Sequence, residues 1–293
     1  MRITRTRTLL AGLGLALAVT GLAACGSSSD KGPDVKVEKA SGLTGVPKEL
    51  ADKGKITIGV KIDQPGIGYK KPGADAPEGF DIEIGKILAG ALGIKADDIK
   101  WVETVSDNRE PFLEKGTVDL VIASYSITDE RRQVVGQAGP YYVTGQQLLV
   151  RKDDADKIKG PEDLKNVKVC SVEGSTSLAR VQDQYGAKPV PFATYSECVD
   201  QLENKTVDAV TTDGAILLGY AAQKPDELQV VGDPFSEERY GVGYKKDAAG
   251  MCDFINKTLQ KSFDDGTWAD AFKATLGESG VETPDPPKLD ACA

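Results

Sequence analysis

Residues 113–121 read LEKGTVDLV, and residues 202–210 read LENKTVDAV, 89 residues further along the chain. In each copy a helix-like segment ends, a short turn follows, and Thr-Val-Asp leads into an apolar run typical of a strand. We infer that the two halves of the chain share this local topology. The same offset aligns Ser124 with Asp213, so both residues should lie at the carboxyl ends of equivalent strands. In open α/β sheets ligands bind at that end, and two facing halves would present both residues to one cleft.

Strand-like and helix-like segments alternate on either side of this repeat. KITIGVKI, from Lys55, alternates as a strand does, and residues 81–92 have a helical pattern that Asp81 can start and Gly93 can end. The apolar face of this helix consists of Ile84, Ile87, Leu88, Ala91 and Leu92. This alternation predicts an α/β fold with mostly parallel sheets, and the 293 residues suggest about two domains.

Composition excludes several classes of function. The formal net charge is -9 and the pI about 4.8, which argues against a nucleic-acid partner. The chain has no histidine, so histidine-dependent catalytic triads and HExxH zinc sites are excluded. We expect neither a metal nor a cofactor.

The N-terminus has the pattern of an export signal. Residues 2–7 include three arginines, and residues 9–19 are apolar but too short to span a membrane. Leu-Ala-Ala-Cys then ends at Cys25, which resembles a bacterial lipobox with Cys25 as the lipidated residue. The alternative is an ordinary secretory signal with an incidental cysteine. We expect a signal peptide over residues 1–24, a flexible polar tether over 25–46, and a lipid anchor on the extracytoplasmic face of the cell membrane.

Export implies an oxidising compartment, in which cysteines tend to pair. Four cysteines remain besides Cys25, and they allow three pairings: Cys170, Cys198, Cys252 and Cys292. Free buried thiols are the alternative.

Residues 122–132, IASYSITDERR, combine hydroxyls and an arginine at the end of an apolar strand. Thr128 is a good helix N-cap, and Arg131 then lies in the first turn beside the strand end. Its planar guanidinium can hold a carboxylate through two parallel hydrogen bonds. We therefore expect a small anionic group here; the alternative is a surface arginine paired with Asp129 or Glu130.

The second half of the chain offers complementary groups. Gly174-Ser175-Thr176-Ser177 follows a strand and opens a probable helix, where exposed N–H groups favour an anion; simple N-capping by Ser175 is compatible with this. Asp213 could pair with an ammonium group, or cap the helix that follows it.

Several segments together resemble the polar amino-acid binding proteins of ABC importers. They are GFDIEIGKIL, NREPFLEKGTVDLVIASYSITDERR, GPYY, VEGSTSL and VDAVTTDGAILLGYA, and the resemblance covers about residues 55–276. It implies a two-lobed type II periplasmic-binding-protein fold, with two hinge-crossing strands and the ligand in the interlobe cleft. NREPFL and KIDQP are most similar to the glutamate/aspartate branch.

This resemblance implies lobe limits and a disulfide pairing. We expect lobe 1 over residues 47–149 plus 241–293 and lobe 2 over 150–240, with crossings near 148–152 and 237–243. Each lobe then contains two of the cysteines, which favours Cys170–Cys198 and Cys252–Cys292.

The resemblance also implies roles for the cleft residues. The α-carboxylate would be held by Arg131, Ser126, Ser175 and Thr176, the α-ammonium by Asp213 and Ser124, and a side-chain carboxylate by Arg109, Lys61 and Tyr195. Arg109 could instead pair with Glu110 or Glu114, and Lys61 could be solvated. A buried cation without a partner costs roughly 3–5 kcal/mol, so such a cleft should prefer glutamate or aspartate to glutamine.

We therefore expect a monomeric lipoprotein that captures glutamate or aspartate, with their amides as further candidates. It would deliver the amino acid to an ABC permease and its ATPase, and would not be an enzyme. One alternative is a ligand-sensing subunit of a signalling system. Another is a dehydratase of small acids, in which Asp213 or Glu173 would have to act as the acid or base.

Overall fold

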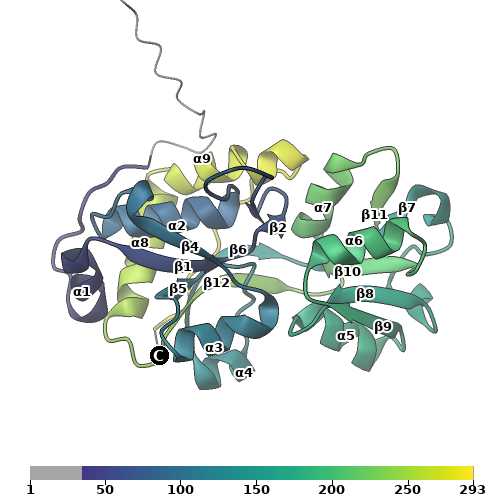
Figure 1. Ribbon diagram of the computed structural model, residues 1–293, viewed down its shortest axis with the longest axis horizontal. Coiled ribbons are helices and arrows are strands. Elements are labelled where there is room, and N and C mark those ends of the chain that lie inside the picture. Colours follow the sequence, from purple (N-terminus) through teal and green to yellow (C-terminus); the bar gives the residue numbers. More distant parts are fainter. Residues whose placement is uncertain (1–34, 293) are drawn as a thin grey trace, which may run out of the picture. The chain divides into compact units, whose positions relative to one another are not determined.

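The computed structural model describes residues 35–292 (Figure 1). The expected signal peptide and Cys25 lie outside the described residues, as does the first part of the tether. Within the described range, no helix combines the length and the hydropathy that a membrane span requires.

Two five-stranded sheets organise the described chain, one in each lobe (Figure 1). The first has the order β4 (Ile99–Glu103), β1 (Ile56–Val60), β5 (Leu120–Val121), β12 (Glu238–Tyr244), β6 (Gly136–Thr144). The second has the order β11 (Leu228–Val231), β7 (Gln146–Arg151), β10 (Ala209–Asp213), β8 (Lys168–Val172), β9 (Lys188–Phe192). In each sheet three neighbouring strands run parallel, and the next strand pairs antiparallel with them. A short hairpin joins β2 (Asp63–Gln64) to β3 (Gly68–Tyr69).

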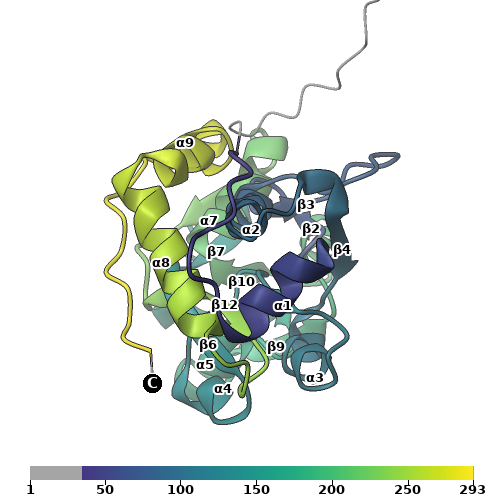
Figure 2. The same cartoon turned by 90° about the vertical axis from the view of Figure 1, so that its left-hand side faces the viewer.

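Helices cover both sheets. Those of the first lobe are α1 (Gly45–Lys53), α2 (Phe80–Ala91), α3 (Arg109–Glu114), α4 (Asp129–Val134), α8 (Met251–Asp264) and α9 (Thr267–Lys273). Those of the second are α5 (Thr176–Gln184), α6 (Tyr195–Glu203) and α7 (Gly214–Gln223). The C-terminal segment runs beside α8, where the Asn256 side chain donates to the carbonyl of Asp290 at 2.8 Å (Figure 2).

The sequence repeat corresponds to a repeated hydrogen-bond pattern. The Asp119 N–H donates to the Thr57 carbonyl at 2.8 Å, and the Asp119 carboxylate accepts from the Thr57 N–H at 2.7 Å. Asp208, the equivalent residue in the second copy, makes the same two bonds to Lys168, at 2.9 and 3.3 Å. In each lobe, this aspartate therefore anchors the start of a strand, β5 or β10, to its neighbour, and the other end of that strand faces the pocket.

Apolar burial follows the expected helix face and strands. Ile84 and Leu88 of α2, and Leu92 directly after it, are at most 1% exposed. Beside them, Phe80 packs its ring edge-on against Trp268 and Phe272, with centroids 5.8 and 5.2 Å apart. These contacts join α2 to α9 and hold the C-terminal helices on the first lobe.

The chain passes between the sheets at two adjacent points. β6 ends at Thr144 and β7 begins at Gln146, while β11 returns to β12 through residues 232–237. A Cβ on Gly145 would lie 2.4 Å from the Ser236 carbonyl oxygen, so the two crossings touch. The first crossing lies just before the range 148–152 expected from the sequence, and the exact lobe limits stay a prediction.

Two disulfides are present, with the pairing favoured by the sequence analysis. Cys170–Cys198 joins β8 to α6, and Cys252–Cys292 joins α8 to the C-terminal segment.

Candidate functional site

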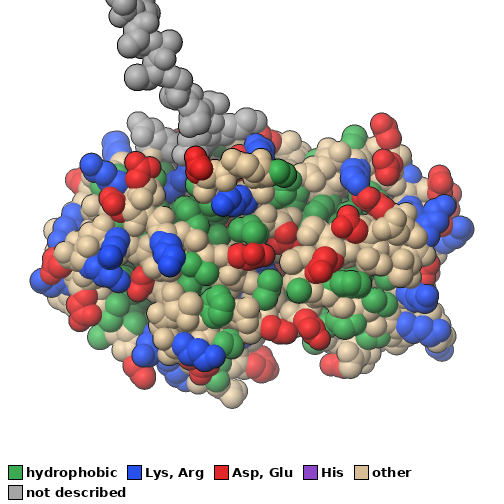
Figure 3. Space-filling view, viewed as in Figure 1, with side chains coloured by type: hydrophobic (Ala, Val, Ile, Leu, Met, Phe, Trp, Pro, Cys, Tyr) green, Lys and Arg blue, Asp and Glu red, His purple; other side chains and the backbone are tan. Residues whose placement is uncertain are grey.

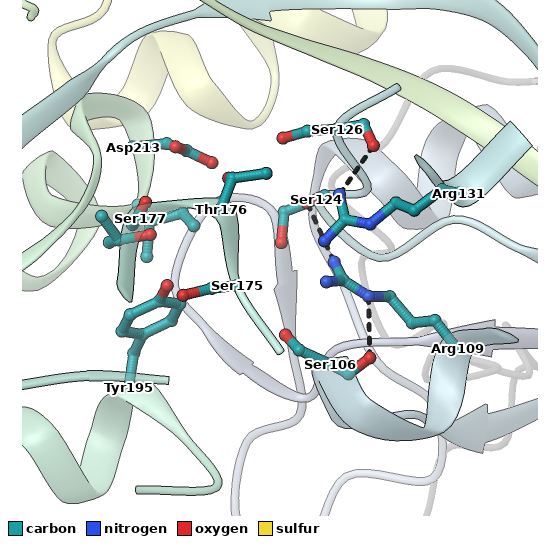
Figure 4. Close-up of a pocket in the computed structure, with 12 residues that line it drawn as sticks. Ser106, Arg109, Ser124, Ser126, Arg131, Ser175, Thr176, Ser177, Tyr195 and Asp213 are labelled. Carbon is teal, nitrogen blue, oxygen red and sulfur yellow. Dashed lines mark hydrogen bonds between the residues drawn. The ribbon is translucent and has the colours of Figure 1, made fainter. Parts of the chain in front are cut away.

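A pocket lies between the two lobes, and side chains from both line it (Figure 4). One side carries two guanidinium groups with three serines, and the other carries a carboxylate, a phenol and several hydroxyls. The lining residues are Ser106, Arg109, Ser124, Ser126, Arg131, Ser175, Thr176, Ser177, Tyr195, Thr212, Asp213 and Ile216. Eight of the nine residues predicted to contact a ligand are in this set, and Lys61 is the ninth.

Arg131 is oriented by groups on both lobes. Thr128 caps α4 by accepting from the Arg131 N–H at 3.2 Å, which places Arg131 in the first turn as expected. The guanidinium donates to the carbonyls of Ser126 at 2.7 Å and Gly174 at 3.1 Å. Its Nε pairs with Glu110 at 3.2 Å rather than with Asp129 or Glu130, and the side chain is 10% exposed.

Arg109 is buried and donates to backbone carbonyls. It is 3% exposed and bonds the carbonyls of Ser106 at 3.1 Å and of Gly174 at 3.2 Å. Its guanidinium lies 4.6 Å from the centroid of the Tyr125 ring, and that of Arg131 lies 4.9 Å from the same ring. Stacking on one aromatic ring holds both cations in place despite their mutual repulsion. Burial, followed by the charge of Arg131, lowers the pKa of Arg109 to about 10.

Asp213 supplies the negative charge on the opposite side. Its carboxylate is 4% exposed, and Oδ2 accepts from the Tyr240 hydroxyl at 2.6 Å. Oδ1 is buried and has no hydrogen-bond partner among the described residues. Asp213 occupies the N-cap position of α7, yet its side chain makes no capping bond. Burial raises the pKa of Asp213 to about 7, and the nearby charge of Glu238 adds to the shift.

Ser124 owes its position to a residue that the sequence analysis placed elsewhere. Its backbone is left-handed, with φ 42°, a conformation that costs a non-glycine residue about 1 kcal/mol or more. The Asp81 carboxylate accepts from the Ser124 N–H at 2.7 Å and from the Tyr141 hydroxyl at 2.6 Å. The prediction that Asp81 starts the helix was therefore wrong: Gly79 is the N-cap, and the buried Asp81 braces the strand end.

The start of α5 approaches the first lobe closely. Ser175 caps the helix by accepting from the Leu178 N–H at 3.0 Å, so the capping alternative holds. Gly174 precedes it with φ 71°, and a Cβ there would lie 2.1 Å from an oxygen of Asp107. Only glycine allows the Gly174 carbonyl to reach both arginines.

Lys61 lies behind the pocket wall. It is 4% exposed, so the alternative of a solvated lysine does not hold, and its Nζ donates to Ser106 Oγ at 2.9 Å. Burial, followed by the charge of Arg109, lowers the pKa of Lys61 to about 7. Lys61 therefore reaches the pocket through Ser106 and not directly.

Four lining residues were not predicted from the sequence: Ser106, Ser177, Thr212 and Ile216. Ser177 follows Thr176 and Thr212 precedes Asp213, so their position next to predicted residues could have identified them. Ser106 precedes α3 by a short turn, and nothing in the sequence shows that Lys61 holds it.

Acidic and basic side chains are interspersed on the face shown in Figure 3. The overall negative charge therefore does not form a single acidic surface there. The polarity of the pocket depends on its own buried groups, because exposed charges are screened beyond about 8 Å at physiological salt.

Comparison with known sequences identifies relatives over most of the chain. Residues 56–278 match the profile of the bacterial extracellular solute-binding proteins, family 3. The chain is 38% identical over 287 residues to the glutamate-binding protein GluB of Corynebacterium efficiens, covering 93% of this chain and 92% of the relative. It is 36% identical over 267 residues to the ABC transporter glutamine-binding protein GlnH of Bacillus subtilis, covering 90% and 95%.

Solved structures agree with this match. An ancestral arginine-binding protein bound to glutamine has a TM-score of 0.71 and 35% identity, covering 76% of this chain and 98% of that one. The ancestral amino-acid-binding protein AncCDT-1, a precursor of cyclohexadienyl dehydratase, has a TM-score of 0.71 and 30% identity, covering 80% and 100%. The type II periplasmic-binding-protein fold predicted from the sequence is confirmed.

Proposed function

Since the chain belongs to family 3 of the bacterial extracellular solute-binding proteins, we propose that it captures glutamate or aspartate outside the cytoplasm for an ABC importer. A permease and its ATPase would receive the amino acid. The relatives named for glutamate and glutamine binding support an amino-acid ligand.

The observation that carries the proposal is a carboxylate with one oxygen unbonded among the described residues, lying across the pocket from two arginine side chains. Asp213 Oδ1 is buried without a partner among the described residues, a costly state that an α-ammonium would relieve. Arg131 faces it from the other lobe and would hold the α-carboxylate.

The acidic side chain is the finer part of the proposal. Arg109 is a buried cation that lines the pocket, and Lys61, which gains its charge below about pH 7, lies behind Ser106. A neutral side chain would leave this positive charge uncompensated, whereas a second carboxylate would neutralise it. Tyr195 could add a hydroxyl to the same subsite.

The test is calorimetric titration of the full chain carrying Cys25→Ser, which prevents lipidation. Glutamate, aspartate, glutamine, asparagine and arginine are compared. We expect one acidic amino acid to bind with the amides at least about tenfold weaker, a difference of about 1.4 kcal/mol. Tighter binding of glutamine or arginine would refute the acidic specificity, and no binding of any of them would refute amino-acid capture.

Membrane attachment is a separate part of the proposal. The LAAC sequence ending at Cys25 supports a lipid anchor. We expect the wild-type chain, but not Cys25→Ser, to incorporate radiolabelled palmitate and to sediment with membranes. Equal behaviour of the two would refute it.

Catalysis is the second candidate, because a precursor of a dehydratase has a similar structure. That structure is itself described as an amino-acid-binding protein, which favours binding. NMR of the bound amino acid distinguishes the two, since an enzyme would convert it and a receptor would return it unchanged.

A further inference from the structure

The two crossings between the lobes meet at a buried polar network beside the pocket. Glu238, the first residue of β12, is 2% exposed, and Gln146, the first residue of β7, is fully buried. Ser236 connects them: its hydroxyl donates to Glu238 Oε1 at 2.9 Å and accepts from the Gln146 N–H at 3.0 Å. Neither Glu238 nor Gln146 lines the pocket.

Arg180 of α5 ties both crossings to the second lobe. Its Nη1 donates to Glu238 Oε1 and to Gln146 Oε1, each at 2.8 Å. Thr176, one turn earlier on the same helix, donates its hydroxyl proton to Glu238 Oε2 at 2.9 Å. Both oxygens of Glu238 therefore accept hydrogen bonds. Oε1 accepts from Ser236 and Arg180, and Oε2 accepts from Thr176 of the pocket wall.

Glu238 is ionised. Although burial raises the pKa of Glu238, hydrogen bonds outweigh it and hold that pKa below its usual value. The donors are Arg180, Ser236 and Thr176. Thr176 lines the pocket, so this buried anion binds one hydroxyl of the pocket wall.

The direction of the hydrogen bond from Thr176 decides what its hydroxyl offers a ligand. A hydroxyl has a single proton, and in Thr176 that proton is donated to Glu238. The Thr176 oxygen is therefore left as an acceptor, which suits an ammonium group rather than a carboxylate. Asp213, whose pKa the Glu238 charge helps to raise, lies on the same pocket.

We propose that Glu238, held in place by Arg180, is a positioning residue for the ammonium side of the ligand site, orienting the Thr176 hydroxyl as an acceptor. This hydroxyl then serves the ammonium and not, as the sequence suggested, the carboxylate. The inference rests on the proposed capture of an amino acid but is independent of its side chain. It links the ligand site to both crossings, which must move when the lobes open.

The test compares Glu238→Gln with Asp154→Asn in the full chain carrying Cys25→Ser. Both changes turn an arginine-paired carboxylate into an amide, but Asp154 pairs with Arg151 at 2.7 Å and does not line the pocket. The probe is whichever amino acid the wild-type chain binds. We expect Glu238→Gln to weaken binding about 10- to 100-fold, as for a hydrogen bond to a charged group, and Asp154→Asn to leave it unchanged.

The pH profile separates positioning from general damage. Asp213 must be ionised to accept an ammonium, so affinity falls on the acid side, and removing the Glu238 charge lowers the pKa of Asp213. In Glu238→Gln, the pH at which affinity falls on the acid side (the acid limb of the profile) should therefore be lower than in the wild type. A merely structural defect would leave that pH unchanged. The ionisable groups that act on Asp213 are Tyr240, Tyr142, Tyr195, Arg109, Arg131 and Glu238, and the variant alters only the last.

Further variants cover the case in which Glu238→Gln does not fold. Thr176→Val should weaken binding about tenfold, and Arg180→Lys should bind more tightly than Arg180→Met, because lysine retains the charge that faces Glu238. Wild-type affinity in both Thr176→Val and Glu238→Gln, or an unmoved acid limb, would overturn the inference. If the wild-type chain binds no amino acid, the proposed function fails and this inference fails with it.

Discussion

The carboxyl ends of β5 and β10 occupy equivalent positions in the two lobes, but the residues there differ in chemistry. At the start of each strand, the preceding aspartate, Asp119 or Asp208, makes the same two hydrogen bonds to a neighbouring strand. At the other end, Ser124 has a left-handed backbone and donates its N–H to Asp81, while Asp213 has a buried carboxylate oxygen without a hydrogen-bond partner in the described part of the chain. The repeated sequence determines the backbone frame, and the chemistry comes from partners that other elements bring to it.

The two lobes also differ in charge at the pocket. The first contributes the guanidinium groups of Arg109 and Arg131, stacked on Tyr125, and the second contributes Asp213. Because both arginines also donate to the Gly174 carbonyl of the second lobe, these two cations connect the lobes. The charges on the two sides therefore complement a molecule with separate positive and negative ends, in one orientation.

Removing the anion of the second lobe should have the largest effect. Asp213→Asn leaves an amide in place of the only carboxylate among the lining residues, so an ammonium loses its charged partner. We expect amino-acid affinity to fall by about two powers of ten or more, since breaking a buried charge pair costs about 2–5 kcal/mol. Calorimetry measures the loss.

Asp208→Asn is the matched control for this variant. Asp208 immediately precedes the same strand, but its side chain is 50% exposed and does not line the pocket. It should retain wild-type affinity, and a comparable loss in both variants would mean that the strand, not the charge, was at fault.

Removing a cation of the first lobe should alter selectivity. Arg109→Met takes away a buried charge that only an acidic side chain would compensate, so glutamate should lose about 3 kcal/mol while glutamine loses much less. The measured quantity is the ratio of the two affinities. Arg151→Met, which removes an arginine of the second lobe outside the pocket, should leave that ratio unchanged. An unchanged ratio in Arg109→Met would assign the selectivity to another residue.

As pH falls, protonation of Asp213 in the second lobe and of Lys61 in the first should change the affinity for glutamate in opposite directions. Burial raises the pKa of Asp213 to about 7, so protonation below that pH removes the ammonium acceptor and weakens binding of every amino acid. Burial also lowers the pKa of Lys61 to about 7, so the same fall in pH charges Lys61 and favours a side-chain carboxylate. The affinity for glutamate should therefore fall less than that for glutamine between about pH 8 and pH 6.

Lys61→Met tests the origin of this difference. Without the lysine, the glutamate and glutamine profiles should become parallel, both falling as Asp213 is protonated. If the glutamate profile of the variant stays flatter, the compensating proton is taken up elsewhere.

Local pattern was sufficient for the α/β alternation and for part of the pocket, whereas the two-lobed fold and the assignment of Arg109 and Tyr195 followed from the family resemblance. The offset between the two repeats is enough to predict that Ser124 and Asp213 lie at equivalent strand ends. Arg131 followed from a helix cap, and Ser175 and Thr176 from a helix start.

The remaining features depend on contacts between distant segments, and local pattern does not contain them. Asp81 resembles a helix cap in sequence, and its true role requires Tyr141 and Ser124 to be brought to it from β6 and the end of β5. Lys61 was predicted to contact the ligand, and the structure shows it bonded to Ser106 and outside the set of lining residues. Glu238 was not singled out at all, because its significance arises only where α5 meets both crossings.

The contact between the β2 hairpin and α6 should have the smallest effect of these changes, and it tests whether the lobes are held together outside the pocket. The Asp63 carboxylate accepts from the N–H groups of Tyr195 and Ser196, at 2.8 and 3.3 Å, at the start of α6. A charge at a helix N-terminus contributes about 0.3–1 kcal/mol at exposed sites and up to ~2 kcal/mol in partly buried ones. Asp63→Ala should weaken binding about 3- to 10-fold, mainly through faster dissociation, because it removes a contact between the lobes.

Asp63→Asn and Glu197→Ala sharpen this last comparison. Asparagine keeps an acceptor oxygen without the charge, so its effect should lie between those of wild type and alanine. Glu197 caps the same helix from within the second lobe, accepting from the Thr194 N–H at 3.0 Å. Glu197→Ala should lower the thermal stability of the protein with little change in dissociation rate. If it speeds dissociation as much as Asp63→Ala does, the integrity of α6 controls the dissociation rate, and the contact between the lobes does not.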